Sequence, residues 1–346
     1  MSGRFRRCRA GAVLLVAWLA MPGGVQAQST PPAPKPAPEA ESPFAAIRAL
    51  IDDGNVAAAL ERLATLDQSD PQVRLLKGVA FFHADRPGDA AMVLEPLREQ
   101  LPAGSPARHE ADQVLGLCLF LLNRYGEAIP LLERTRELMP DDTELLFTLG
   151  QAYIHTRDAA RARSALAGAF GLPADSAAAH VAAAQLMIRL QIEDLAETEL
   201  KAALEKAADT PRANYLLGQL ALFRGRLDEA VARTRRELEI NPTDAMSLAQ
   251  LGDAFVRQGR WDEAIAALQR SIWLNPFYSG PYILLGQAYL AQGQPATAEG
   301  LARKAIAYDP NNRTAHYLLG QALQRLGRMA EAREAFAAAE RLQNAR

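Results

Sequence analysis

Cysteine is scarce in this sequence of 346 residues. It has two cysteines, Cys8 and Cys118, and Cys8 lies in a leader segment that we expect to be removed from the mature chain. A chain with one remaining cysteine cannot form an internal disulfide, so its fold must be stabilised by packing alone. Cys118 lies in an apolar stretch, which predicts a small buried side chain rather than a reactive thiol.

The sequence also lacks the residue patterns of common catalytic and metal sites. Its five histidines are scattered, no two stand four residues apart, and none has a cysteine companion at zinc-binding spacing. It contains no glycine-rich phosphate loop, nucleophile elbow or kinase signature. We therefore expect a chain that is not an enzyme and that holds no metal and no cofactor.

Basic charge and aromatic residues are limited as well. The formal net charge is -2, and aromatic residues make up 6% of the chain. Four arginines lie in the leader, which has no acidic residue, so its removal takes the net charge from -2 to -6. A mildly acidic chain does not offer the clustered basic side chains that binding to nucleic acid requires. Hydrophobic residues, at 49%, are rich in Ala and Leu, which favours closely packed helices.

Residues 1–27 have the features of a secretory signal peptide. A basic region from Arg4 to Arg9 precedes 12 apolar residues, Ala10 to Met21, and a small-residue cleavage site ends at Ala27. Twelve apolar residues are too few to cross a bilayer of about 30 Å as a helix. We therefore predict cleavage after Ala27, no membrane span in the mature protein, and a periplasmic or secreted location.

Residues 28–43 are dominated by proline, with six prolines among alanine, lysine and glutamate. Such a segment cannot bury a core, and its composition is typical of an extended, disordered linker. We expect residues 44–346 to form the folded part of the chain.

Small residues recur in this folded part with a period of 34 residues. Glycine occupies one repeated place, alanine a second place about 12 residues later, and proline a third: Gly116, Gly150, Gly218, Gly252, Gly286 and Gly320; Ala128, Ala162, Ala196, Ala230, Ala264, Ala298 and Ala332; Pro140, Pro242, Pro276 and Pro310. A glycine at the first place lets two helices approach closely. Because the residue before proline is pushed out of the helical region, the third place ends a helix. Each unit therefore contains two helices.

This pattern resembles the tetratricopeptide repeat (TPR) family, most closely from Met246 to Pro276. The resemblance implies an all-α fold, a right-handed superhelical solenoid of antiparallel helix pairs. About eight to nine units are expected, near 44–70, 71–108, 109–142, 143–176, 177–210, 211–244, 245–278, 279–312 and 313–346. The unit at 177–210 departs most from the pattern, with Ala184 in place of glycine and Gln191 where others have glycine.

The resemblance also implies that the first helix of each unit lines the concave face of the solenoid. On these helices glutamine recurs after the repeated glycine, with apolar residues four places before it and three places after it, a spacing that forms one helical stripe. Amides can pair with a peptide backbone, and aromatic rings add rigid contact area. The predicted partner-binding groove consists of Phe147, Gln151, Gln185, Tyr215, Gln219, Phe223, Ile283, Gln287, Tyr317 and Gln321. A repeated glutamine is equally compatible with a structural consensus that binds nothing.

Aromatic residues gather around the unit at 245–278. Trp261 and Trp273 flank its second helix, and Tyr278 and Tyr282 follow. We expect these rings to pack between helices rather than to bind a ligand. The last helix, near Met329 to Leu342, carries apolar as well as charged residues. Formation of a homo-oligomer through the terminal repeats is therefore an alternative that the sequence allows.

The sequence favours a protein-interaction scaffold or adaptor of the periplasm or cell envelope. Its partner would be a protein or peptide segment held in the groove, and not nucleic acid. The main alternative is a periplasmic chaperone or assembly factor for envelope or secreted proteins, which would bind broadly. An enzyme acting in the groove would need an inward-facing pair of carboxylates, which the stripe lacks. A structural self-assembler would use the end units.

Overall fold

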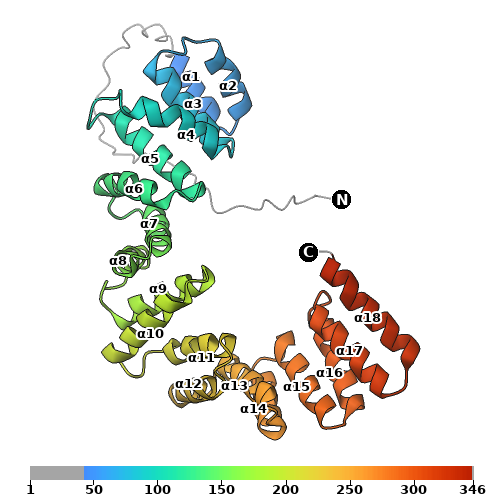
Figure 1. Ribbon diagram of the computed structural model, residues 1–346. Coiled ribbons are helices and arrows are strands. Elements are labelled where there is room, and N and C mark those ends of the chain that lie inside the picture. The colour runs from blue at the N-terminus through green and yellow to red at the C-terminus, as the bar shows by residue number, and fades with distance from the viewer. Residues whose placement is uncertain (1–42, 345–346) are drawn as a thin grey trace, which may run out of the picture. The chain divides into compact units, whose positions relative to one another are not determined.

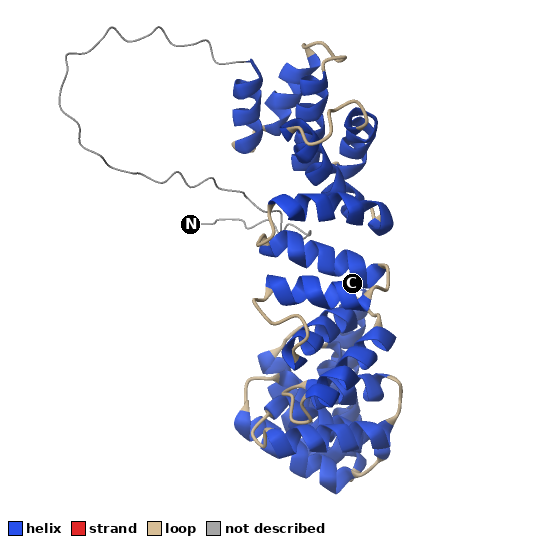
Figure 2. Cartoon of the chain, turned by 90° about the vertical axis from the view of Figure 1, so that its left-hand side faces the viewer, coloured by secondary structure: helices blue, strands red, loops and turns tan. Residues whose placement is uncertain are grey.

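The computed structural model describes residues 43–344, so the predicted signal peptide and nearly all of the predicted linker lie outside the described residues. Within residues 43–344 the chain forms 18 helices and no strand (Figure 2). The helices follow one another in pairs (Figure 1). The all-α fold class of paired helices is thereby confirmed, whereas the right-handed sense of the superhelix stays a prediction.

Each pair consists of a first and a second helix, and from α2 onward every helix packs against the next one along the chain. The first helices are α1 (Pro43–Asp52), α3 (Pro71–His83), α5 (Pro106–Leu121), α7 (Thr143–His155), α9 (Ala177–Arg189), α11 (Ala213–Phe223), α13 (Ala245–Gln258), α15 (Ser279–Ala291) and α17 (Arg313–Arg325). The second helices are α2 (Val56–Ala64), α4 (Pro87–Arg98), α6 (Tyr125–Leu138), α8 (Ala159–Ala169), α10 (Glu193–Lys206), α12 (Leu227–Ile240), α14 (Trp261–Leu274), α16 (Pro295–Tyr308) and α18 (Met329–Asn344). None of these helices is both long and apolar enough to cross a membrane.

The turn within each pair contains a residue with a positive φ angle. Glycine supplies it in five pairs, at Gly54, Gly225, Gly259, Gly293 and Gly327. In the pair formed by α9 and α10 the residue is Gln191, with φ 61°. The left-handed conformation costs a residue with a side chain roughly 1–2 kcal/mol. The departure noted in the sequence therefore leaves the turn intact and adds a modest strain.

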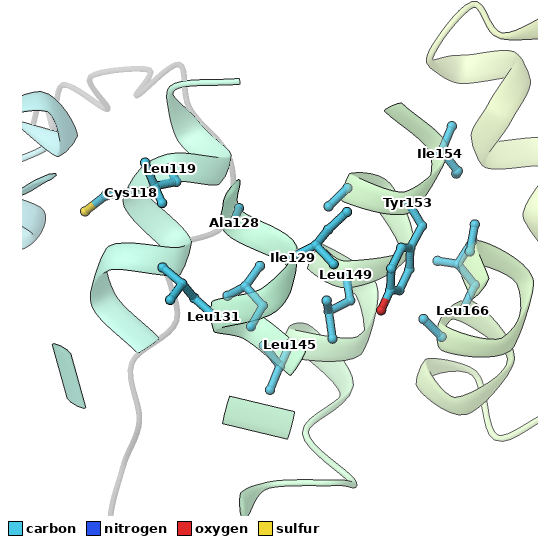
Figure 3. Packing of buried hydrophobic residues seen from close by; sticks show 14 of the residues in the cluster. Cys118, Leu119, Ala128, Ile129, Leu131, Leu145, Leu149, Tyr153, Ile154 and Leu166 are labelled. Atoms are coloured by element: carbon cyan, nitrogen blue, oxygen red, sulfur yellow. The ribbon is translucent and has the colours of Figure 1, made fainter. Parts of the chain in front are cut away.

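The repeated glycine lies where the two helices of a pair approach most closely. A Cβ atom on Gly150 would lie 2.7 Å from Cγ of Leu166, and one on Gly252 would lie 2.4 Å from Cγ of Leu268. Both leucines are fully buried. Figure 3 shows Leu166 in this packing, beside Leu149 and Tyr153 of α7. The close approach predicted for the repeated glycine is confirmed.

Cys118 is buried in the same apolar core, as predicted, and it is a free thiol (Figure 3). Burial raises the pKa of the thiol to about 12. Because the thiolate is the reactive form, Cys118 stays protonated and unreactive near neutral pH.

We expect Cys118 to react with a disulfide-exchange reagent at pH 8 at least about 100-fold more slowly in the folded chain than in urea. A Cys8→Ser variant makes Cys118 the reporting thiol in the full chain. The measurement is the absorbance of the released thiolate over time. Rapid reaction in native buffer would show that the core around α5 opens readily.

The core becomes polar between α11 and α14. Thr234 stands at the place that Leu166 and Leu268 occupy in other pairs. The amide of Gln250 fills the remaining space, donating from Nε2 to Oγ1 of Thr234 (2.8 Å) and to the carbonyl of Tyr215 (3.1 Å). Tyr215 is therefore fixed through its backbone as well as by the burial of its ring.

The prediction that both tryptophans pack between helices is wrong for one of them. Trp261 is partly buried against the core of α13 and α14, as expected. Trp273, in contrast, is 81% exposed on the last turn of α14. Tyr282 is buried, and Tyr278 is 42% exposed.

Candidate partner-binding site

The predicted groove residues all lie on first helices, but their exposure differs. Gln219, Phe223 and Tyr317 are exposed, and Phe147 and the remaining glutamines are partly buried: Gln151, Gln185, Gln287 and Gln321. Tyr215 and Ile283 are buried, with 9% and 7% exposure. These two side chains therefore support the stripe by packing and offer little surface to a partner.

Three of the predicted residues line one cavity of about 360 Å³: Phe147 of α7, Gln185 of α9 and Gln219 of α11. The other lining residues are Phe170, Ala182, Leu186, Ile188, Arg189, Arg212 and Leu216. Three consecutive first helices thus contribute to the cavity, and the other seven predicted residues do not line it. Sequence reasoning missed Phe170, which follows α8, and both arginines.

A larger hollow of about 510 Å³ lies at the turns after α11 and α13. Three of its lining residues already have polar partners, because Gln258 donates to Asp228 (2.8 Å) and Arg260 donates to Glu263 (2.5 Å). With its side chains so engaged, this hollow offers less to a ligand than the cavity between α7, α9 and α11.

One side chain that lines the cavity is smaller than its counterpart in another pair. First helices of successive pairs pack directly at α3/α5, α11/α13, α13/α15 and α15/α17, but not to a comparable extent at α5/α7, α7/α9 or α9/α11. In α17, Leu318 lies against Gly286 of α15. The residue at the same place in α9 is Ala182, which lines the cavity. The smaller side chain leaves space in α9 that a leucine would occupy.

The cavity is basic as well as apolar. Arg189 and Arg212 line it, and no acidic residue does. Within residues 43–344, neither guanidinium has a carboxylate oxygen within 4 Å. At the place of Arg189, α13 has Arg257, which donates from Nε to Asp253 at 2.9 Å. The positive charge that α13 neutralises therefore remains available in α9.

Arg212 is held at the edge of the cavity by a buried carboxylate. It precedes α11 with φ 68°, in the left-handed conformation, and its side chain does not cap the helix. Instead its backbone N–H donates to Oε1 of Glu237 on α12 (2.7 Å), and the N–H of Tyr215 donates to Oε2 (3.2 Å). The guanidinium lies over the ring of Tyr215, 5.2 Å from its centroid, in cation–π geometry. Glu237 and Tyr215 together fix this arginine.

Thr210 does not cap α11, although capping residues stand at its place in other pairs. Thr210 stands at the place of the capping residues Asp142 and Ser176, but its hydroxyl donates to the carbonyl of Ala207 (2.6 Å). Because α11 then begins without a side-chain cap of its own, Glu237 accepts the N–H groups at its start. This role depends on tertiary placement, and no local pattern predicts it.

The junction between α10 and α11 is held by Glu197. A hydrogen bond from Lys201 (2.7 Å), with a further contribution from Arg224, lowers the pKa of this carboxyl to about 2. Its pKa in an unfolded chain is about 4.3. Because the folded value is the lower one, the stabilising contribution is complete above about pH 4.3 and is lost as the pH falls toward 2.

We expect Glu197→Gln to lower the stability of α10 and α11 by less than about 1 kcal/mol at pH 7, since these ion pairs are partly solvated. The difference from the unaltered chain should disappear as the pH approaches 2. Hydrogen exchange of the two helices at pH 7 and at pH 3 measures it. Glu205→Gln is the matched control, because Glu205 forms no ion pair with the residues that the structure describes. An equal effect of the two substitutions would contradict the assignment.

The described part of the chain gathers no group of three or more His, Cys, Asp or Glu side chains that could hold a metal ion. The chemistry of the cavity is instead that of reversible contact, with apolar side chains, amides and guanidinium groups. Such an arrangement can bind a polypeptide segment.

Comparison with known families gives matches along most of the described chain. The sequence model described as Tetratricopeptide repeat matches residues 44–105, 194–245 and 283–345. A second model of that description matches residues 119–186, and one described as TPR repeat matches residues 252–293. A comparison with curated proteins found no significant match.

Several solved structures are similar to this chain. One is MamA, with 26% identity over 45% of this chain and 92% of that chain, and a TM-score of 0.41. A second is MamA 41-end from Desulfovibrio magneticus RS-1, with 23% identity over 50% and 97% and a TM-score of 0.45. A third is PilW, described as a type IV pilus biogenesis factor, with 21% identity over 56% and 90% and a TM-score of 0.46. The segments matched by the first sequence model alone cover just over half of the 346 residues, and the chain belongs to the tetratricopeptide repeat family.

Proposed function

We propose that this chain is a protein-interaction scaffold of the periplasm or cell envelope, and that it binds a segment of a partner protein on the face formed by α7, α9 and α11. Tetratricopeptide repeat proteins bind protein partners, which supports the scaffold class. The observation that carries the position of the site is the cavity to which three consecutive first helices contribute. The location rests on the signal-like composition of residues 1–27.

The cavity can hold a partner segment by contacts to the backbone of that segment and to one of its side chains at the same time. The amides of Gln185 and Gln219 have no hydrogen-bond partner among residues 43–344, and each offers two donors and an acceptor. Phe147 and Phe170 form an apolar wall, with ring centroids 6.3 Å apart in edge-to-face geometry. A partner backbone can pair with the amides while its side chain lies against the rings.

Site-specific photo-crosslinking in cells tests this assignment. Benzoylphenylalanine at Gln219 places the probe on the proposed face, and the same residue at Thr198, which is exposed on α10, is the control. The scaffold proposal expects a few discrete crosslinked proteins at Gln219 and none of them at Thr198. A broad smear at Gln219 would favour the chaperone alternative, and discrete crosslinks at Thr198 alone would move the site elsewhere.

The location is tested separately with alkaline phosphatase, which is active only after export. We expect residues 1–43 fused to the mature enzyme to give activity in intact cells. Replacing Arg4, Arg6, Arg7 and Arg9 by glutamate should abolish that activity, because the basic region is needed for export. An inactive fusion of the unaltered leader would overturn the periplasmic proposal.

A further inference from the structure

We infer that the cavity takes an acidic segment of the partner, in which one large apolar side chain enters the cavity and carboxylates on either side of it pair with Arg189 and Arg212. The inference rests on the proposed function, because it names the chemistry of the segment bound on that face. Two independent features carry it: an apolar lining left open to solvent, and two guanidinium groups without acidic partners in the described part of the chain.

The apolar lining calls for a large side chain. Phe170 is 54% exposed although its ring packs edge-to-face on Phe147. Ile188 and Leu216 add aliphatic surface. A volume of about 360 Å³ accommodates a leucine or phenylalanine side chain and leaves room for the backbone that carries it. Covering these rings and aliphatic groups with an apolar side chain removes their surface from water, which favours binding.

The charges specify what flanks that side chain. Guanidinium groups bind carboxylates through paired, charge-assisted hydrogen bonds. The ten residues that line the cavity include two arginines and no aspartate or glutamate. The comparison with α13 is direct, since Asp253 neutralises Arg257 there while α9 has Gln185 at the place of Asp253. A ligand that supplies the missing carboxylates is therefore complementary to this cavity.

The positions of the arginines favour side-chain carboxylates over the C-terminus of a partner. Arg189 is the last residue of α9, whereas Arg212 immediately precedes α11, so the two border the cavity from opposite helix ends. A chain terminus brings a single main-chain carboxylate to one place. Acidic residues on both sides of an apolar anchor satisfy both arginines within one continuous segment.

Contacts within the chain already order Arg212 in the absence of a ligand. Its backbone is fixed by Glu237 and its guanidinium lies over the ring of Tyr215. Left-handed backbone in a residue with a side chain persists where the surroundings hold it, often at binding sites. Because the side chain is already ordered, less conformational entropy is lost when a carboxylate binds.

Binding of defined peptides to the purified chain tests the inference. Four fluorescein-labelled peptides of 12 residues are compared by fluorescence polarisation. The first has Leu-Phe at its centre, two glutamates on each side and an amidated C-terminus. The second has glutamine for each glutamate, the third has Ser-Ser at its centre, and the fourth is the second with a free C-terminal carboxylate. We expect the first to bind at least about tenfold more tightly than the others, with an affinity that falls as salt rises.

Variants of the chain separate charge from fold. Arg189→Gln and Arg212→Gln should each lower the affinity for the acidic peptide about tenfold and leave the affinity for the glutamine peptide unchanged. Arg257→Gln, in which the lost arginine is already paired with Asp253, should change nothing. Ala182→Leu should fill the cavity and block every peptide without lowering the melting temperature, because Leu318 occupies the same place in α17.

The outcomes distinguish this inference from the function on which it rests. Equal binding of the acidic and glutamine peptides, or tightest binding of the peptide with the free C-terminus, overturns the inference and leaves the scaffold proposal standing. If no peptide binds, mass spectrometry of the segment crosslinked at Gln219 decides: acidic residues on both sides of an apolar one support the inference, and their absence overturns it. If Gln219 gives no crosslink either, the proposed function fails as well.

Discussion

Replacing Gly252 by valine is expected to destabilise the pair formed by α13 and α14 by about 3 kcal/mol, because added groups in a filled core force side chains and backbone to shift. The first added atom, Cβ, would already lie 2.4 Å from Cγ of Leu268, a contact that side chains do not make. Leu268 is fully buried, so a shift of its side chain must be taken up inside the core. Valine is a better helix former than glycine, but that gain of a few tenths of a kcal/mol is too small to offset the clash.

The effect should be local, because each pair of helices in a repeat protein packs only on its neighbours. Hydrogen exchange resolved by helix is therefore the appropriate measurement, and α13 and α14 should lose protection first. Gly300→Ala is the matched control: Gly300 lies inside α16, and nothing lies within 4 Å of its added Cβ. This substitution should stabilise α16 by up to about 1 kcal/mol. Unchanged or raised stability of the Gly252→Val variant would show that close approach does not explain the glycine at 252.

The repeat pattern predicted the fold because it reports local geometry. The spacing of small residues depends on contacts within one pair, as at Gly150 and Leu166, so it can be read without knowing how pairs stack. The error at Trp273 came from setting this repeat pattern aside. The residues at its place in other pairs are Glu205, Glu239 and Ala307, which indicate an exposed position. Hydrophobicity alone suggested the core, whereas the repeat frame pointed to solvent.

The candidate site was only partly predictable. The stripe of glutamine and apolar residues includes Phe147, Gln185 and Gln219, which the structure brings to one cavity. The cavity itself depends on how α7, α9 and α11 are stacked, and Ala182 is one of the small side chains that leave space there. Such a property belongs to the stacking of pairs. Periodicity within a helix does not encode it.

A second large effect is expected at Asp112, which is buried in α5 with 3% exposure. Nε of Arg98 on α4 lies 2.5 Å from its carboxylate, and Nε of Arg134 on α6 lies 2.9 Å away. Nε of Arg108 is at 3.6 Å. One carboxylate thus joins three successive helices and balances guanidinium groups that are themselves partly buried. Asp112→Ala should destabilise α4, α5 and α6 by about 3 kcal/mol, because three partly buried guanidinium groups lose the carboxylate they share, and Arg98 alone keeps another at 2.7 Å, that of Glu99.

Glu95→Ala is the control, since Glu95 also pairs with an arginine, Arg124 at 2.7 Å, but on the surface with 41% of its side chain exposed. Its loss should cost less than about 1 kcal/mol and should matter less in high salt. Urea unfolding and helix-resolved hydrogen exchange compare the two. If both substitutions had equal effects, burial would not decide the strength of these pairs. If Asp112 dominates, burial decides which arginines in this chain depend on a carboxylate for stability, and exposed arginines such as Arg189 and Arg212 are stable without one and remain free to pair with a ligand.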